Sequence, residues 1–247
     1  MNFGTNNRLG SGKYIVVEAD EYDRSFLTLS PIIAAITNIE ADHLDCYANL
    51  TDIKNAFIQF ANKVPFFGCV IACLDDEGVQ SVLPEIKKRI ITYGLSRQAD
   101  VRAINIRVEN FRTKFDVLYR DYNIGEIETA LLGKHNIQNA LLSVAIGIEM
   151  DVAFESIHKG LNDFKGVYRR FEFKGEEKGI RVYDDYAHHP TEIKATLSGV
   201  RENTGKRILV LFQPHLYSRT RDFALEFGRS FYHSDLLFIA PIYPARE

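Results

Sequence analysis

The sequence contains no tryptophan, only three cysteines and no long apolar run. No apolar stretch approaches the roughly 20 residues that a membrane-spanning helix needs, and the N-terminal MNFGTNNRLGSGK has no apolar core typical of a signal peptide. Three cysteines give no paired disulfide framework. Strand alternation in CVIAC would place Cys69 and Cys73 on one face, so we expect buried free thiols rather than a metal or redox site. These absences favour a protein of the reducing cytoplasm that does not contact a membrane.

A large excess of either charge is also absent. Thirty Lys and Arg residues oppose 33 Asp and Glu residues, which gives a formal net charge of −3. This balance argues against a general nucleic-acid surface and against a polybasic membrane patch. The 46% hydrophobic and 26% charged residues are typical of a soluble globular protein, and 247 residues suffice for one large domain or two ordinary ones.

Short apolar runs alternate with helix-like segments in the first part of the chain. Apolar residues at helical spacing, from Ile53 to Phe60, predict a helix over residues 52–62. Nearly unbroken apolar runs are typical of parallel strands covered on both faces, and they predict strands over 14–18, 32–37, 69–74 and 89–94. The expected fold class is therefore α/β, with a mostly parallel sheet.

The pattern changes to polar–apolar alternation from about residue 100 to residue 132. This alternation predicts an antiparallel set of strands with turns near Asn110 and Asn123. Two helices are expected next, over 135–149 and 153–163, and then a break near 166–170. After the break a second series begins, in which we expect three parallel-type strands over 180–185, 207–212 and 235–240, a helix opened by Pro190 and a helix near 221–231.

Acidic side chains cluster after the first two expected strands. Glu18 lies in VVEADEYD and His43 in TNIEADHLD, and ligands of open α/β sheets bind at the carboxyl ends of strands. Such a pair suits Mg²⁺ bound to a nucleotide phosphate. The alternatives are a solvated acidic loop and a structural histidine. LGSGKY (9–14) is not a phosphate-binding loop, because it lacks the first glycine and the hydroxyl residue of that motif and precedes a strand.

Two further stretches could contact a nucleotide. GKHNIQNA opens a helix and places His135, Asn136 and Asn139 on its first turn and a half, where they can read the edge of a base. Helix capping, the alternative, explains only one of the three. YRRFE, which contains Arg170, is either surface charge or a phosphate clamp at the break.

DDYAHHPTE and FQPHLYSRT follow the first two expected strands of the second series and therefore face the break. The first contributes Tyr186 and His188, and the second contributes His215 and Arg219. Arginine is the usual partner of a small-molecule carboxylate, so these stretches predict a site for a small anion or an amino acid. The alternative for DDYAHHPTE is a capped strand-to-helix turn that uses His189 and Pro190.

Six motifs in this chain occur in the same order in the Mur ligases, and the resemblance covers nearly all of the sequence: EADEYDRSFL, TNIEADHLD, GKHNIQNA, YRRFE, DDYAHHPTE and FQPHLYSRT. The resemblance implies that residues 1–167 are the central ATPase domain without its phosphate-binding segment. It implies that residues 168–247 are the first half of a Rossmann-like C-terminal domain that binds an amino acid. Both ends of the chain are therefore expected to be truncated.

The resemblance also implies a ligase that uses ATP and Mg²⁺ to join L-alanine to UDP-N-acetylmuramate through an acyl phosphate, in peptidoglycan synthesis. Glu18 and His43 resemble the Mg²⁺ ligands, and with His188 and Arg219 they resemble the catalytic residues. The residues that resemble ATP contacts are His135, Asn136, Asn139 and Arg170. The residues that resemble the L-alanine pocket are Tyr186, His188, His215 and Arg219. Leu216 departs from the arginine that many relatives carry there, which leaves the carboxylate to His215 or Arg219.

Two other functions stay open at this point. The EADEYD form also occurs in a Mur ligase that adds a whole murein tripeptide to the same sugar nucleotide, although FQPHLYSRT favours L-alanine. A binding module without catalysis is the other possibility. Because the phosphate-binding segment is absent, the isolated chain is expected to be inactive. The motifs indicate no oligomeric state.

Replacement of Arg219 by alanine tests the pocket that the motifs predict. A desolvated bidentate contact to a carboxylate contributes about 1.5–3 kcal/mol, so Arg219→Ala in the whole enzyme should raise the KM for L-alanine roughly tenfold or more. The KM for ATP should change far less, and steady-state kinetics with each substrate varied in turn measures both. Equal effects on both KM values would assign Arg219 to another role, and an unchanged KM for L-alanine would favour the capped-turn alternative.

Overall fold

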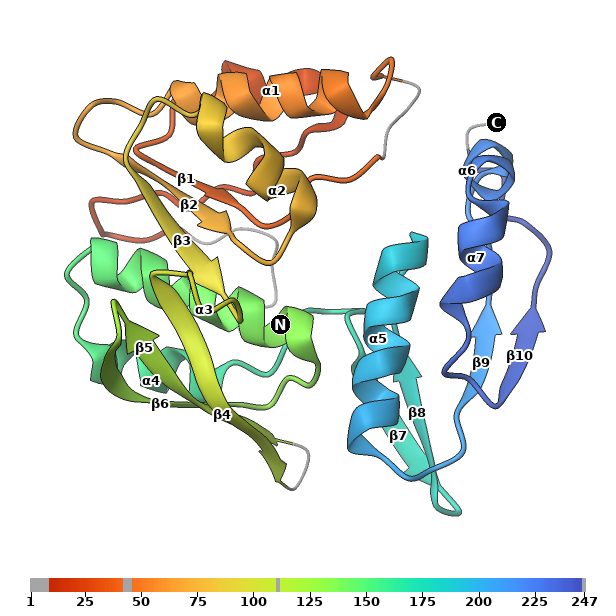
Figure 1. Ribbon diagram of the computed structural model, residues 1–247. Helices are drawn as coiled ribbons and strands as arrows, with labels where there is room; N and C mark the ends of the chain where they lie inside the picture. The colour runs from red at the N-terminus through yellow and green to blue at the C-terminus, as the bar shows by residue number, and fades with distance from the viewer. Residues whose placement is uncertain (1–8, 42–45, 110–111, 246–247) are drawn as a thin grey trace.

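The computed structural model describes residues 9–41, 46–109 and 112–245 (Figure 1). Its largest element is a six-stranded sheet with the strand order β1-β2-β3-β4-β5-β6. Strands β1 to β4 pair in parallel, and β4, β5 and β6 pair antiparallel. Their bounds are β1 Ile33–Ile36, β2 Cys69–Cys73, β3 Ile90–Gly94, β4 Val101–Glu109, β5 Arg112–Tyr119 and β6 Tyr122–Thr129. The expected change from parallel to antiparallel pairing near residue 100 is confirmed.

Helices cover this sheet on both faces, as the unbroken apolar runs require. The helices of this part are η1 Tyr22–Thr28, α1 Leu50–Asn62, α2 Glu77–Val82, η2 Leu83–Glu85, α3 Lys134–Glu149 and α4 Phe154–Asp163. Val70 and Ala72 of β2 pack in one core cluster with residues of α1 and α2, and Cys69, Ile71 and Cys73 pack in another with residues of α3. Figure 1 shows α1 and α2 on one side of β2 and α3 on the other. We call η1 to α4, residues 22–163, the sheet unit.

A second, smaller unit follows. Its elements are β7 Glu172–Glu177, β8 Ile180–Asp184, α5 Pro190–Asn203, β9 Leu209–Phe212, α6 Tyr217–Asp222, α7 Ala224–Ser230 and β10 Leu236–Ile239. Strands β9 and β10 pair in parallel, and a core that includes Leu197 of α5, Phe212 of β9 and Phe227 of α7 holds the unit together. We call residues 172–239 the C-terminal unit.

Strand β8, which was expected as the first of three parallel-type strands, differs from that expectation. Strand β8 pairs antiparallel with β7, and these two form a separate sheet in the described chain. Lys178 and Gly179 connect them, and both have positive φ angles, of 50° and 79°. A two-residue loop with positive φ at both positions matches the twist of a tight hairpin, which is why the chain turns back here.

Residues 14–18 also differ from the expectation, because they form no strand in the described chain. Ile15 and Val16 are 88% and 94% exposed. An apolar run becomes a strand only where another strand bonds its backbone, and the edge strand β1 pairs with β2 instead. The strand predicted over 14–18 is therefore wrong for this structure.

Two expected turns have different outcomes. The hairpin expected near Asn123 turns at Arg120 and Asp121, whose φ angles are 48° and 69°. The turn expected near Asn110 lies outside the described residues. Within the described ranges, no helix combines the length and apolar composition needed to cross a bilayer.

The three thiols should differ in reactivity. Cys69 and Cys73 are free and buried, as expected, whereas Cys46 is partly exposed. Burial raises the pKa of Cys69 to about 11 and raises that of Cys73 as well. Because the thiolate is the reactive form, Cys69 should react with a maleimide at pH 8 about a hundredfold more slowly than after unfolding in urea, and Cys73 should also react more slowly.

Mass spectrometry of the labelled chain over time measures these rates. One fast equivalent is expected in the native chain, and Cys46→Ser should remove it. A fast equivalent that remains in Cys46→Ser would contradict the buried positions of Cys69 and Cys73.

Candidate active site

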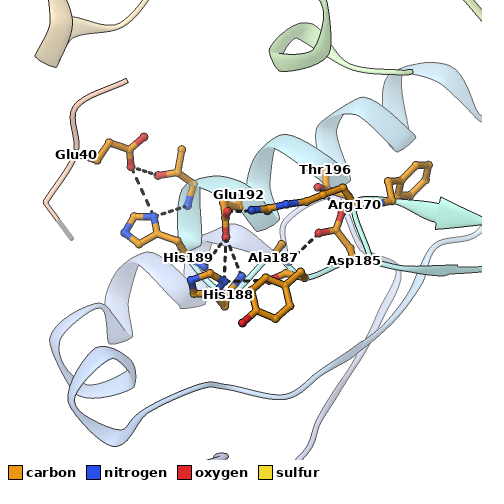
Figure 2. Close-up of polar contacts among 11 residues, drawn as sticks. Glu40, Arg170, Asp185, Ala187, His188, His189, Glu192 and Thr196 are labelled. Carbon is orange, nitrogen blue, oxygen red and sulfur yellow. Dashed lines mark hydrogen bonds and ion pairs between the residues drawn. The ribbon is translucent and has the colours of Figure 1, made fainter. Parts of the chain in front are cut away.

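The segment between β8 and α5 begins its helix with a capping box. His189 is the N-cap, Pro190 occupies the first turn, and Glu192 bonds back to the start of the helix. One carboxylate oxygen of Glu192 accepts the backbone N–H groups of His188 at 2.9 Å and of His189 at 3.2 Å (Figure 2). The capped turn, considered above as an alternative to a ligand site, is therefore present. It does not use the side chain of Tyr186, which leaves that side chain available to a ligand.

Glu192 also binds the chain that connects the two units. Its other carboxylate oxygen accepts a hydrogen bond from Arg170 Nη1 at 2.8 Å. Burial acts to raise the pKa of Glu192, but the hydrogen bonds from the His188 amide and from Arg170 outweigh it, so the pKa is lowered. Glu192 is thus an anion that holds Arg170 and the loop before α5 in one arrangement.

Three of the predicted pocket residues lie together. The rings of Tyr186 and His188 have centroids 5.3 Å apart, and those of His188 and His215 lie 6.1 Å apart. The guanidinium of Arg169 lies 4.9 Å from the centre of the Tyr186 ring, which is a cation–π distance. Tyr186 is 48% exposed, so its ring can still contact a ligand.

Hydrogen bonding fixes which nitrogen of His188 carries the proton. His188 Nδ1 lies 3.0 Å from the carbonyl oxygen of Tyr186 and 3.5 Å from a carboxylate oxygen of Glu192. Both neighbours only accept hydrogen bonds, so Nδ1 carries the hydrogen of the neutral ring. Nε2 of neutral His188 is then the acceptor nitrogen.

Arg219 lies on α6, in the connection that also contains His215. Leu216 precedes α6 with a φ of 70°, an unusual angle for a side chain branched at Cγ. The backbone N–H of Leu216 donates to the carbonyl of Tyr243 at 2.9 Å, and the rings of His215 and Tyr243 stack with centroids 5.7 Å apart. Tyr243 therefore supports the segment from which His215 and Arg219 extend.

The start of α3 holds the three predicted nucleotide contacts. Asn136 Nδ2 donates to the Leu132 carbonyl at 2.8 Å and lies 3.0 Å from His135 Nε2, whereas Asn139 is exposed. Burial lowers the pKa of His135, the nearby Asp185 partly opposes this, and Arg170 adds to it. His135 is thus neutral near pH 7. Its Nε2 accepts from Asn136 Nδ2, so Nδ1–H is the donor that it can offer to the edge of a base.

Of the two predicted metal ligands, only Glu18 lies among the described residues. Glu18 lies in an exposed segment without helix or strand, and His43 lies outside the described residues. No group of three His, Cys, Asp or Glu side chains that could hold a metal ion occurs in the part of the chain that the structure describes.

Three acidic side chains at this site were not among the predicted site residues: Glu40, Asp185 and Glu192. Asp185 accepts the backbone N–H of Ala187 at 2.7 Å and the hydroxyl of Thr196 at 3.1 Å. Glu192 could have been found, because a proline followed two residues later by glutamate is a helix-start signal. Glu40 carried no comparable signal, since its partner Thr191 lies 151 residues away in the sequence.

Comparisons with known proteins give the family of both parts of the chain. A model of the Mur ligase middle domain matches residues 6–147, and a model described as "Mur ligase, glutamate ligase domain" matches residues 169–246. A UDP-N-acetylmuramate–L-alanine ligase from Geotalea daltonii is 51% identical over 246 residues, which are 100% of this chain and 54% of that protein. One from Salinibacter ruber is 51% identical over 99% of this chain and 52% of its own length. The chain thus spans about half the length of the curated relatives it matches.

The fold has a counterpart among solved structures. The crystal structure of a UDP-N-acetylmuramate–alanine ligase from Thermotoga maritima matches with a TM-score of 0.73 and 26% identity, over 89% of this chain and 48% of that one. The α/β fold class, with a mostly parallel sheet and added antiparallel strands, is confirmed.

The lowered pKa of Glu192 predicts a pH-dependent loss of stability. The ionised carboxylate stabilises the folded state fully above its ordinary pKa of 4.5, and this contribution disappears as the pH falls through the lowered value. Glu192→Gln should therefore lower the unfolding midpoint by roughly 5 °C at pH 7, and the difference from wild type should be smaller at pH 3.

Thermal unfolding followed by circular dichroism at both pH values measures this difference. Glu202→Gln, an exposed change on the same helix, is the matched control and should have little effect at either pH. A Glu192→Gln effect of equal size at pH 3 and pH 7 would mean that the charge of Glu192 does not hold the network.

Proposed function

Because this chain belongs to the Mur ligase family, whose middle-domain model covers more than half of it, we propose that the whole protein joins L-alanine to UDP-N-acetylmuramate. ATP would transfer its γ-phosphoryl group to the muramoyl carboxylate, leaving ADP. The L-alanine amine would attack the acyl phosphate, form the amide and release phosphate. This reaction belongs to peptidoglycan synthesis and would take place in the cytoplasm. The observation that carries the proposal is 51% identity over the whole chain to a UDP-N-acetylmuramate–L-alanine ligase.

The proposal divides the work between two domains. Residues 1–167 would form the nucleotide-binding part and residues 168–247 the part that binds the amino acid. Neutral His135 and the exposed amide of Asn139 suit the adenine edge. Arg170 donates one hydrogen bond to Glu192 and has further N–H groups that can meet a phosphate.

L-alanine would bind around Tyr186, His188, His215 and Arg219. An amino acid carries an ammonium and a carboxylate, so its site needs both an acceptor and a donor. Arg219 is proposed to bind the carboxylate, with its forked N–H groups matched to two oxygens. The amine can attack only after it loses a proton, and Nε2 of neutral His188 is proposed to accept that proton.

Mg²⁺ is part of the proposal through Glu18 and His43. The described residues do not assemble a ligand set around Glu18, so the steps above depend only on side chains of the chain itself. A bound Mg²⁺ would neutralise phosphate charge during transfer.

The substrate assay separates L-alanine from the murein tripeptide. We expect the whole protein, given ATP, Mg²⁺ and UDP-N-acetylmuramate, to release phosphate at least tenfold faster with L-alanine than with the tripeptide. Mass spectrometry should detect UDP-N-acetylmuramoyl-L-alanine. Preference for the tripeptide would assign the recycling reaction instead, and nucleotide or L-alanine binding without any product would indicate a binding module.

A further inference from the structure

Glu40 is presented from a rigid part of the sheet unit. The preceding residue, Ile39, is 3% exposed, and its backbone N–H donates to Asp76 Oδ1 at 3.2 Å. A Cβ on Gly78 would lie 2.1 Å from the Ile39 carbonyl oxygen, so only glycine allows α2 to approach so closely. The backbone that leads to Glu40 is therefore held firmly against the start of α2.

From this anchor Glu40 reaches the C-terminal unit. Its Oε2 accepts a hydrogen bond from Thr191 Oγ1 at 2.6 Å and lies 3.6 Å from His189 Nδ1. Figure 2 shows Glu40 approaching the first turn of α5 from the side opposite Arg170. The side chains of His189 and Glu40 are only 13% and 30% exposed, so the contact is partly shielded from water.

A second contact between the units lies further along α5. A Cβ on Gly199 would lie 3.1 Å from the Cα of Gly133, the residue before α3. Thr191 and Gly199 are eight residues apart on one helix, which corresponds to about 12 Å. Two separated contacts fix the direction of a helix, whereas the glycine contact alone would let α5 swing.

We infer that Glu40 is a positioning residue that sets the orientation of α5, and with it the C-terminal unit, relative to the sheet unit. Thr191 is its hydrogen-bond partner, and the ring of His189 shields this contact. The consequence for catalysis rests on the proposed function: the loop before α5 carries Tyr186 and His188, so Glu40 would aim the bound amino acid at the other unit.

This role predicts a specific kinetic signature. The side chains proposed to bind L-alanine all lie in the loop before α5 or after β9, so loss of Glu40 leaves that pocket intact within its own unit. Misorientation should therefore lower kcat and spare KM. Arg219→Ala is expected to show the reverse pattern.

Steady-state kinetics of the whole protein test the predicted loss of kcat. Glu40→Ala and Thr191→Val should each lower kcat about fivefold, with the KM for L-alanine within about twofold of wild type. The double variant should lose no more than either single variant, because both remove one interaction. Glu40→Gln keeps an oxygen acceptor for the Thr191 hydroxyl and should retain most of the wild-type kcat. Additive losses, or a Glu40→Gln variant as slow as Glu40→Ala, would overturn the assignment.

A distance measurement tests the contact without any activity. Spin labels at Gln59→Cys on α1 and Glu202→Cys on α5, both exposed positions, report the orientation of the two units in a Cys46→Ser chain. Glu40→Ala and Thr191→Val should broaden the distance distribution, and Glu155→Ala, an exposed change on α4, should not. An unchanged distribution in Glu40→Ala would overturn the positioning role. Inactivity of the whole protein toward L-alanine would overturn only the proposed function.

Discussion

The carboxylate of Glu192 is the interaction on which the candidate site depends. It accepts the amides of His188 and His189 and a guanidinium N–H of Arg170, so it joins the start of α5, the loop before it and the connection between the units. Donors that surround a partly buried carboxylate stabilise its charge, and the carboxylate fixes the same donors in return. Removal of the Glu192 carboxylate would release the cap of α5 and the side chain of Arg170 together. The positions of Tyr186 and His188 depend on both contacts.

The sheet unit supplies the other half of the site, and a carboxylate that accepts several hydrogen bonds holds this half as well. Asp75 follows β2, accepts the backbone N–H of Leu95 after β3 at 2.7 Å, and accepts Gln138 Nε2 of α3 at 2.7 Å. The first turns of α3 are thereby tied to the carboxyl ends of two parallel strands, the edge where ligands of open α/β sheets bind. The proposed base contacts of His135 and Asn139 thus lie on a helix that is fixed to the ends of β2 and β3.

The extent to which sequence predicted the structure follows from the range of each interaction. Strand β2 and helix α1 were predictable because local pattern alone encodes burial on two faces or on one. Residues 14–18 carry the same apolar pattern, yet a strand also needs a partner. Strands β7 and β8 form a hairpin whose signal lies in the Lys178–Gly179 turn rather than in apolar alternation. The cap formed by His189 could be expected, whereas the reach of Glu40 to Thr191 could not, since no spacing rule relates residues so distant in sequence.

The proposed chemistry follows from how the charged groups near α5 are already used. Glu192 is an anion, but two amides and Arg170 occupy its oxygens, so it cannot also bind an incoming ammonium well. Arg170 is likewise partly engaged. The geometry leaves Nε2 of His188 as the acceptor for the amine. The Tyr186 carbonyl and the Glu192 carboxylate both lie near Nδ1 of His188 and set this tautomer. The amine of an amino acid held there is adjacent to the exposed ring of Tyr186, and the carboxylate of that amino acid is left to Arg219 of α6. A zwitterion therefore matches both Nε2 of His188 and the guanidinium of Arg219, whereas a simple anion would leave Nε2 of His188 unused.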